Sequence, residues 1–274
     1  MPMHDLTNRV AVITGGGSGI GRATAIALAG GGVRVLVTDV SGDRADAVAE
    51  EITAAGGAAS GHRCDVSSDN DMAATRDAVL DRFGRVDIVM NNVGVLVMGA
   101  PEAIPVTAWQ RVIDINLVSV ARSISLFLPH LLAQGSGHIV NTSSTAGLFA
   151  YSYERLPYSA TKGAVMALSE ALALYTRPRG VGVTVLCPGP VATNIAEQVE
   201  VFGEVGRIRG PGLALLDPAA VGEQVVDAIR RDIFFLPTHP EVHELLVRRA
   251  QDPEGFLARQ IDNLRADDAA AGSG

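Results

Sequence analysis

Short apolar runs rich in β-branched residues recur along the chain, separated by longer stretches in which apolar positions follow a helical spacing. The runs predict strands at residues 9–14, 33–38, 86–90, 138–141 and 181–186, with a weaker one at 58–63 and a late one at 233–236. Helical patterns cover residues 19–30, 43–55, 69–83, 107–132, 158–177 and 218–231. Strands that alternate with helices of ten or more residues pair in parallel, because a parallel pair needs a crossover connection.

The predicted strands are almost continuously apolar, which is typical of a sheet covered on both faces. Right-handed crossovers then predict a doubly wound open α/β sheet. We expect a single domain over residues 1–266. Within it lie a glycine-containing flap at 194–216 and a helical C-terminal extension at 238–266, and residues 267–274 form a disordered tail.

Composition narrows the class of protein. The 274 residues are 47% hydrophobic and 19% charged, which is enough apolar material for a sizeable core. Lys and Arg number 22 against 30 Asp and Glu, a net charge of −8 that argues against nucleic acid as a partner. The pattern shows neither a secretory signal nor an uninterrupted membrane span, so we expect a cytoplasmic protein. Cys64 and Cys187 are expected to be buried free thiols, and Cys187 is given no catalytic role.

A glycine-rich turn follows the first predicted strand. It reads Thr14-Gly15-Gly16-Gly17-Ser18-Gly19-Ile20-Gly21 and leads directly into a helix. Glycines let the backbone approach a pyrophosphate, whose charge is stabilised by free N–H groups at the helix N-terminus. Such a turn can also be a plain strand-to-helix connection. Its place after the first strand favours a nucleotide at the carboxyl edge of the sheet.

Asp39 ends the second predicted strand, 18 residues after Gly21. A carboxylate there can accept hydrogen bonds from both ribose hydroxyls of an adenosine and would repel a 2′-phosphate. The alternative is an ordinary turn or helix-cap aspartate before Ser41. Neither Val40 nor Ser41 offers the positive charge that a 2′-phosphate needs, although Arg44 and Arg22 are not far away in sequence. We therefore expect NAD rather than NADP.

Tyr158 and Lys162 are spaced i and i+4, which places both on one face of the predicted helix. An ammonium group beside a phenol favours the phenolate and lowers the tyrosine pKa toward working pH, as a general acid–base requires. A random pair at this spacing is usually structural. Tyr151 is a rival with Arg155 at i+4, but Pro157 argues against a continuous helix there.

Further motifs occur in a fixed order after the glycine turn. They are Asp65, Asn91-Asn92-Val93-Gly94, Asn116, Asn141-Thr142-Ser143-Ser144, Tyr158-Ser159-Ala160-Thr161-Lys162 and Pro188-Gly189-Pro190-Val191-Ala192-Thr193. Over roughly residues 7–237 the chain resembles the classical short-chain dehydrogenase/reductase family. The ordered set is far more specific than any one motif. It implies a Rossmann fold with a seven-stranded parallel sheet, helices on both faces, and a homodimer or homotetramer.

The resemblance implies catalytic roles for four residues. Tyr158 would be the acid–base, and Lys162 would hold the nicotinamide ribose and lower the tyrosine pKa. Ser144 would hydrogen-bond the reacting oxygen. Asn116 would hold a water that connects Lys162 to solvent as a proton relay.

It also implies a cofactor-binding set: Gly15, Gly17, Ser18, Gly19, Ile20, Gly21, Asp39, Asp65, Val66, Asn92, Gly94, Tyr158, Lys162, Pro188, Gly189, Val191 and Thr193. Asp65 would meet the adenine amino group, and Asn91 and Gly94 would flank the adenosine. Thr193 and the Val191 backbone would hold the carboxamide.

Each assignment has a structural alternative. Ser144 could be a strand-end serine, Asn116 a locally bonded helix residue, and Asp65 a turn former. His239 and His243 stand at i and i+4, but a proline lies between them and a third ligand is missing, so no metal site is expected. The chain also departs from the family: Val93 replaces the usual alanine, and an amphipathic segment, 241–264, replaces the usual ending, which puts the common tetramer contacts in doubt.

These observations predict an NAD-dependent oxidoreductase that interconverts a secondary alcohol and a ketone by hydride transfer. The alternatives are an NADPH-dependent carbonyl reductase, a non-catalytic nucleotide-binding protein, and a sugar-nucleotide epimerase, which would use a different glycine spacing and a longer C-terminal domain. Apolar residues at 95–98, 148–151 and in the flap should converge on the nicotinamide pocket, together with Leu156. Arg207 and Arg209 are the only basic residues of the flap. We therefore expect a bulky, mostly apolar substrate, cyclic, aryl or steroid-like, under a closing flap.

Overall fold

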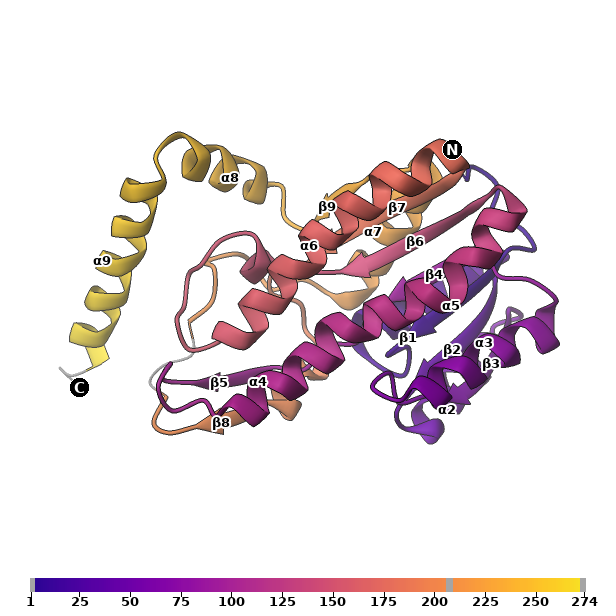
Figure 1. The fold of residues 1–274 in the computed structure, drawn as a ribbon, viewed down its shortest axis with the longest axis horizontal. Helices are drawn as coiled ribbons and strands as arrows, with labels where there is room; N and C mark the ends of the chain where they lie inside the picture. The colour runs from indigo at the N-terminus through magenta and orange to yellow at the C-terminus, as the bar shows by residue number, and fades with distance from the viewer. Residues whose placement is uncertain (1–2, 206–208, 272–274) are drawn as a thin grey trace.

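The computed structural model describes residues 3–205 and 209–271, and its centre is a seven-stranded parallel sheet (Figure 1). In spatial order the strands are β3 (Ala58–Arg63), β2 (Arg34–Asp39), β1 (Val10–Thr14), β4 (Ile88–Asn91), β6 (Gly137–Thr142), β7 (Val181–Cys187) and β9 (Phe235–Pro237). Strand β1 pairs with β2 on one side and with β4 on the other, so the strand order reverses at this point. The predicted doubly wound sheet is confirmed.

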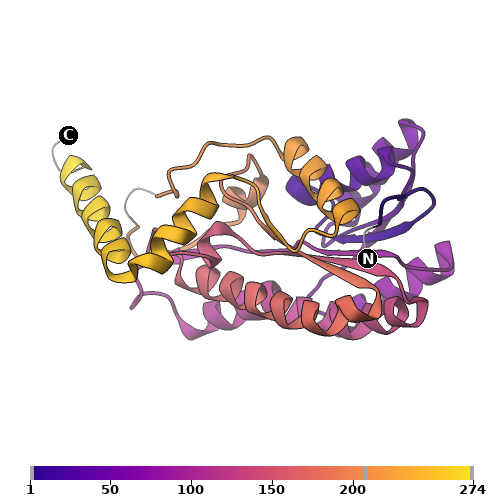
Figure 2. The same ribbon diagram turned by 90° about the horizontal axis from the view of Figure 1, so that it is seen from above.

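Helices cover both faces of the sheet (Figure 2). One layer contains α1 (Gly19–Gly30), α2 (Gly42–Ala54) and α7 (Pro218–Arg231); the other contains α3 (Asp69–Phe83), α4 (Val106–Ile113), α5 (Ser119–Gln134) and α6 (Leu156–Thr176). Successive strand residues point to opposite faces, so Ala11 and Ile13 join the first core while Val10 and Val12 join the second. This two-sided burial explains the continuous apolar strands.

The single helix predicted at 107–132 is interrupted. A π-helical turn, η1 (Asp114–Val118), separates α4 from α5 and contains Asn116. Such a turn widens the hydrogen-bond spacing by one residue and leaves no trace in the hydrophobic period. By length and composition the stretch Val106–Gln134 could cross a membrane, but here it packs along the sheet and against α3 and α6.

A second, two-stranded parallel sheet pairs β5 (Val97–Gly99) with β8 (Glu200–Phe202). The sequence analysis did not predict it, because strands of three residues are too short to show an alternating pattern. β8 lies within the flap, which otherwise contains the short helix η4 (Asn194–Gln198). Arg111 Nη1 reinforces the pairing through a 2.6 Å contact with Glu200 Oε2. Flap residues 206–208 lie outside the described residues.

The C-terminal extension forms two helices, α8 (Glu241–Gln251) and α9 (Pro253–Ala271), which project from one end of the molecule (Figure 1). Val242 and Phe256 are buried against Leu148 and Phe149 in the segment after β6. Because α9 continues to Ala271, the prediction of disorder from residue 267 differs from the structure. The alanines of this tail favour a helix. Residues 272–274, also predicted to be disordered, lie outside the described residues.

Candidate active site

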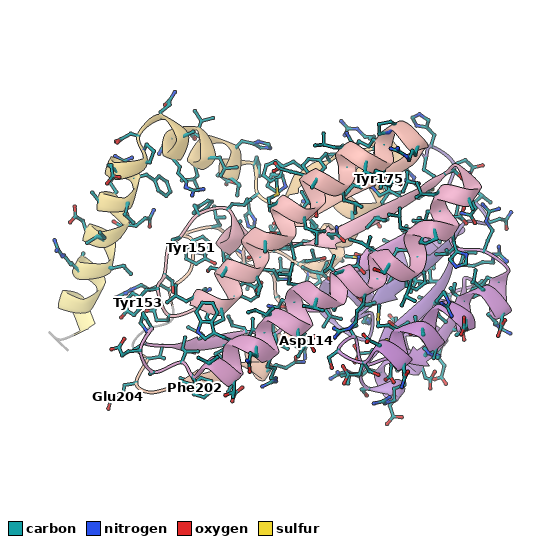
Figure 3. The ribbon with its side chains drawn as sticks, viewed as in Figure 1. Asp114, Tyr151, Tyr153, Tyr175, Phe202 and Glu204 are labelled. Atoms are coloured by element: carbon teal, nitrogen blue, oxygen red, sulfur yellow. The ribbon has the colours of Figure 1, made fainter. Side chains whose placement is uncertain are left out.

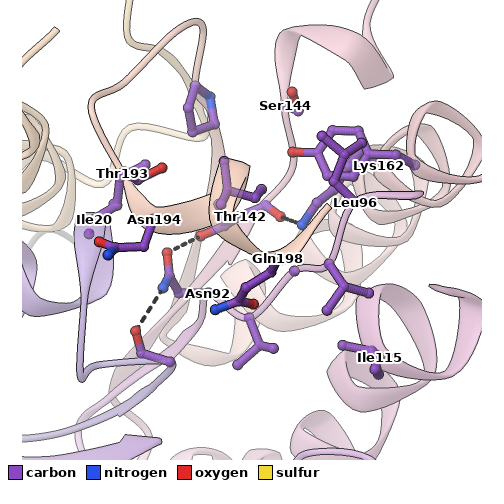
Figure 4. Close-up of a pocket in the computed structure, with 18 of the residues that line it drawn as sticks. Ile20, Asn92, Leu96, Ile115, Thr142, Ser144, Lys162, Thr193, Asn194 and Gln198 are labelled. Carbon is purple, nitrogen blue, oxygen red and sulfur yellow. Dashed lines mark hydrogen bonds between the residues drawn. The ribbon is translucent and has the colours of Figure 1, made fainter. Parts of the chain in front are cut away.

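A cavity of about 1020 Å³ opens at the carboxyl edge of the large sheet (Figure 4). Segments that follow β1, β2, β3, β4, β6 and β7 line it, since the carboxyl ends of parallel strands meet at one edge. Most of the residues predicted from sequence are brought together here: Gly15, Ser18, Gly19, Ile20, Asp39, Asp65, Val66, Asn92, Gly94, Ser144, Tyr158, Lys162, Pro188, Gly189, Val191 and Thr193.

Gly17, Gly21 and Asn116 shape the cavity without lining it. A Cβ atom on Gly21 would lie 2.3 Å from the Gly15 carbonyl oxygen, so only glycine lets the turn pack against the start of α1. Gly15 and Gly19 have φ angles of +63° and +52°, in the left-handed region that favours glycine. The turn therefore needs its glycines for its own geometry.

The N-terminus of α1 differs from those of the next two helices. Ser41 and Ser68 cap α2 and α3 by accepting backbone N–H hydrogen bonds, whereas the Ser18 side chain makes no such bond. The first turn of α1 also carries no acidic residue. Its free N–H groups and the positive end of the helix dipole are therefore available to an anion in the cavity, as a pyrophosphate requires.

Asp39 is buried and accepts several hydrogen bonds. Its Oδ2 accepts from the Gly17 N–H at 3.2 Å, and its Oδ1 accepts from the Ser41 N–H at 3.0 Å and from Arg44 Nη2 at 2.7 Å. Asp39 is thus both a turn residue and a carboxylate at the cavity wall. Arg44, which the sequence placed only nearby, also lines the cavity.

Asp65, like Asp39, lines the cavity, and its Oδ1 accepts hydrogen bonds from the backbone N–H and the hydroxyl of Ser67. Asp65 therefore forms a turn and lines the cavity at once. Asn91 was expected to flank an adenosine, but this was wrong: its side chain is buried and donates to Asn141 Oδ1 at 2.8 Å, joining β4 to β6. The neighbouring Asn92 faces the cavity instead and donates to the Gly15 carbonyl at 3.3 Å.

Ser144, Tyr158 and Lys162 line the other end of the cavity. Figure 4 shows Ser144 and Lys162 on the side away from Ile20 and Thr193. Lys162 Nζ donates to the Thr142 carbonyl at 2.8 Å and lies 5.8 Å from the centroid of the Tyr158 ring. Ser144 follows β6 and caps a 3₁₀ turn by accepting the Ala146 N–H through its hydroxyl. One strand end and one helix face thus position the three groups.

The electrostatics of this group differ from the prediction. Burial raises the pKa of Tyr158 to about 12, against lowering contributions from the Ser144 hydroxyl and the Arg155 charge. Burial also lowers the pKa of Lys162 to about 8. Lys162 was expected to lower the tyrosine pKa, but the enclosed position of the phenol outweighs its neighbours. The hydroxyl therefore keeps its proton at neutral pH.

Asn116 clamps the segment that follows β4. Its Oδ1 accepts the Val95 N–H at 2.8 Å, its Nδ2 donates to the Val95 carbonyl at 3.0 Å, and Nδ2 also reaches Thr161 Oγ1 at 3.3 Å. The side chain is 1% exposed. The π turn places this amide toward the backbone of Val95, which lines the cavity.

The apolar segments converge on the cavity in part. Val95, Leu96, Tyr151 and Ile195 line it, whereas the other described residues predicted for this wall do not: Val97, Met98, Leu148, Phe149, Ala150, Leu156, Val199, Val201, Phe202, Val205, Leu213, Leu215 and Leu216. Val97 and Phe149 belong to separate cores, and Leu215 is largely exposed. Ile208 lies outside the described residues.

The cavity lining is more polar than predicted. Arg155 and Arg209 are both 9% exposed and line the cavity, together with Arg111, Asp114, Asn194 and Gln198. Figure 4 shows Asn194 beside Ile20 and Thr193. None of these stands in a motif that marks it as a site residue. Arg155 was noted only as the i+4 neighbour of Tyr151, and its guanidinium lies 5.1 Å from the centroid of that ring. Figure 3 shows Tyr151 in the segment that leads into α6.

Other candidate residues have structural roles. Cys64 and Cys187 are buried free thiols, as predicted. His239 is buried, and its Nε2 lies 2.8 Å from the Ala214 carbonyl at the base of the flap. Over residues 3–205 and 209–271, no three His, Cys, Asp or Glu side chains form a group that could hold a metal ion.

Comparison with known proteins identifies the family. The sequence profile of the short chain dehydrogenases matches residues 9–201. A cyclohexanol dehydrogenase of Acinetobacter sp. (strain SE19) is 38% identical over 198 residues, which cover 72% of this chain and 78% of the relative. A 3-oxoacyl-[acyl-carrier-protein] reductase of Synechocystis sp. is 34% identical over 241 residues, covering 87% and 92% of the two chains.

The fold agrees. A short-chain dehydrogenase/reductase from Burkholderia phymatum, solved in complex with NAD, superposes with a TM-score of 0.83 at 33% identity, covering 92% of this chain and 96% of the other. The glycine turn and the Tyr158–Lys162 pair lie within the matched residues 9–201. The chain therefore belongs to the short-chain dehydrogenase family of NAD(P)-dependent oxidoreductases.

Proposed function

We propose that this protein is an NAD-dependent dehydrogenase that interconverts a secondary alcohol and its ketone, with Ser144, Tyr158, Lys162 and Asn116 as the catalytic set. The observation that carries the proposal is the grouping of three of these side chains, Ser144, Tyr158 and Lys162, at one end of a cavity whose other end holds the uncapped N-terminus of α1. A dinucleotide and a substrate thus have adjoining places.

The cavity fits a dinucleotide along its length. The free N–H groups of α1 would hold the pyrophosphate, Asp39 the adenosine ribose, and Thr193 with the Val191 backbone the carboxamide. A bound nicotinamide supplies or accepts the hydride. The protein holds the two reacting carbons together and excludes water from around them.

Tyr158 is the proposed proton donor for ketone reduction. Because burial raises its pKa to about 12, the hydroxyl is protonated at neutral pH and can be given to a developing alkoxide. Ser144 would donate a second hydrogen bond to the same oxygen. Lys162, which donates a hydrogen bond to the Thr142 carbonyl, would bind the ribose and return a proton to Tyr158. In the proposed proton relay, Asn116 would hold a water that connects Lys162 to solvent.

The proposed substrate is a bulky, mostly apolar secondary alcohol or ketone. Leu96, Ile195 and Tyr151 supply apolar surface at the Tyr158 end of the cavity. The similarity to a cyclohexanol dehydrogenase supports an alicyclic skeleton.

NADPH-dependent carbonyl reduction is the second candidate, and Arg44 is the observation that favours it. Its guanidinium lies 2.7 Å from Asp39 at the cavity wall and could pair with a 2′-phosphate. Asp39 weighs against it, because a phosphate would stand beside the buried carboxylate. We therefore retain NAD as the proposed cofactor.

The test is a screen of secondary alcohols and ketones with each cofactor, followed by the absorbance of the reduced nicotinamide. Tyr158→Phe should reduce turnover by about 10²–10⁴-fold while NAD binding survives. Tyr151→Phe removes a hydroxyl from the same cavity and is the matched control, which should retain activity. Near-normal turnover by Tyr158→Phe, or an equal loss in the control, would contradict the proposed role of Tyr158.

A further inference from the structure

Arg155 is a buried cation at the substrate end of the cavity, and its hydrogen-bonding capacity is only partly used. Nη2 donates to the Arg209 carbonyl at 2.5 Å, and Nη1 makes a long 3.4 Å contact with the Tyr151 hydroxyl. A guanidinium carries five N–H donors. The Nε–H is buried without a hydrogen-bond partner in the part of the chain that the structure describes. Because protein encloses the Nε–H, the donors that remain for a ligand in the cavity are the second N–H of Nη1 and the second N–H of Nη2.

No carboxylate among the described residues pairs with Arg155. Glu154 is the acid beside it in sequence, but Glu154 lies 3.7 Å from Arg209 and accepts a hydrogen bond from Ser152. Asp114, which also lines the cavity, contacts Arg122 at 2.8 Å. By contrast, Arg111 at the cavity wall pairs with Glu200. Arg155 is thus a cavity-lining charge without an acidic partner in the described part of the protein.

The position of the guanidinium is fixed by the fold. Arg155 precedes the first residue of α6 and stands three residues before Tyr158, and its side chain lies against the Tyr151 ring. Arg155, Tyr151 and Tyr158 all line the same cavity. A ligand group that binds Arg155 is therefore close to the reacting end of the cavity.

We propose that Arg155 binds a carboxylate of the substrate, so that the physiological substrate is a hydroxy acid or oxo acid with an apolar skeleton between its two functional groups. A carboxylate matches the planar fork of a guanidinium with two parallel hydrogen bonds, and it supplies the missing opposite charge. This inference rests on the proposed function, because it assigns a second anchor to the same alcohol or ketone. It replaces a purely apolar substrate with an amphipathic one.

The experiment compares 4-oxocyclohexanecarboxylate with its neutral methyl ester as substrates, in the wild type, Arg155→Met and Arg111→Met. The measured quantity is the ratio of kcat/KM for the acid to that for the ester, which cancels any general effect of Arg155 on Tyr158. The wild type should prefer the acid, and Arg155→Met should lower the ratio by about 10- to 150-fold, the range for one charged hydrogen-bonded group. Arg155→Lys keeps the positive charge but loses the planar, two-pronged donor, so its acid-to-ester ratio should lie between those of the wild type and Arg155→Met.

Arg111→Met removes another charge from the lining of the same cavity and should leave the ratio unchanged. A similar fall of the ratio in Arg155→Met and Arg111→Met would mean that the overall positive potential of the cavity selects the acid. That result would overturn the assignment to Arg155. A wild type that turns over the ester as well as the acid would also overturn it, with the proposed function intact. If neither ketone is reduced with either cofactor, the proposed function fails, and the inference fails with it.

Inhibition supplies a measurement that needs no turnover of the acid. Cyclohexanecarboxylate should inhibit reduction of the ester more strongly than cyclohexanecarboxamide does, and the difference should disappear in Arg155→Met. Equal inhibition by acid and amide in the wild type would contradict the proposal. Thermal unfolding of each variant verifies that the comparison is made on folded protein.

Discussion

Asn116→Ala tests whether the π turn holds the cavity wall in place. The substitution removes the two hydrogen bonds, at 2.8 and 3.0 Å, that pair the Asn116 amide with the backbone N–H and carbonyl of Val95. At a net value of about 0.5–1.5 kcal/mol each, their loss should lower the free energy of unfolding by about 1–3 kcal/mol. Turnover should fall as well, because Gly94 and Val95 form part of the cavity lining.

Urea denaturation followed by circular dichroism measures this loss. Asn70→Ala is the control, since Asn70 is an exposed residue of the first turn of α3 and its replacement should change stability by less than about 0.5 kcal/mol. An Asn116→Ala variant as stable as the control would refute the clamp. If stability were unchanged while turnover collapsed, Asn116 would act on proton transfer alone.

Four shorter predictions follow from the same structure. The rate of alcohol oxidation should increase with rising pH, while the rate of ketone reduction should stay constant from pH 6 to 8, because the raised pKa of Tyr158 keeps the hydroxyl protonated. Initial rates in both directions measure this, and oxidation that is fastest at acidic pH would contradict it. Asp39→Ala should weaken NAD binding and reduce the difference between the affinities for NAD and NADP, as measured by calorimetry. Tighter binding of NADP than of NAD by the native protein would contradict the role proposed for Asp39. Phe256→Ala should undock α9 and speed its cleavage by trypsin, unlike the exposed Leu257→Ala, because the Phe256 ring is buried 6.0 Å from that of Phe149. Light scattering should give a dimer or tetramer at micromolar concentration, since the C-terminal part of α6 leaves the apolar side chains of Leu174 and Tyr175 exposed; a monomer would refute this.

The sequence by itself determined the order of the main elements and much of the cavity lining. Period-two and period-3.6 patterns are local, so the seven strands and the boundaries of α3 could be predicted from the residues alone. The glycine turn and the Tyr158–Lys162 spacing are local as well, because a turn or one helix face fixes their geometry. The ends of parallel strands must share an edge, so these motifs had to meet.

The tertiary structure decided how charges and short pairings are arranged. Arg155 and Arg209 meet because the flap folds back over the start of α6, a contact between residues 54 positions apart that no local pattern encodes. The β5–β8 pairing and the π turn at Asn116 are too short or too irregular to produce a periodic signal. The pKa of Tyr158 depends on how completely the assembled walls remove the phenol from water, and spacing to Lys162 cannot reveal that burial.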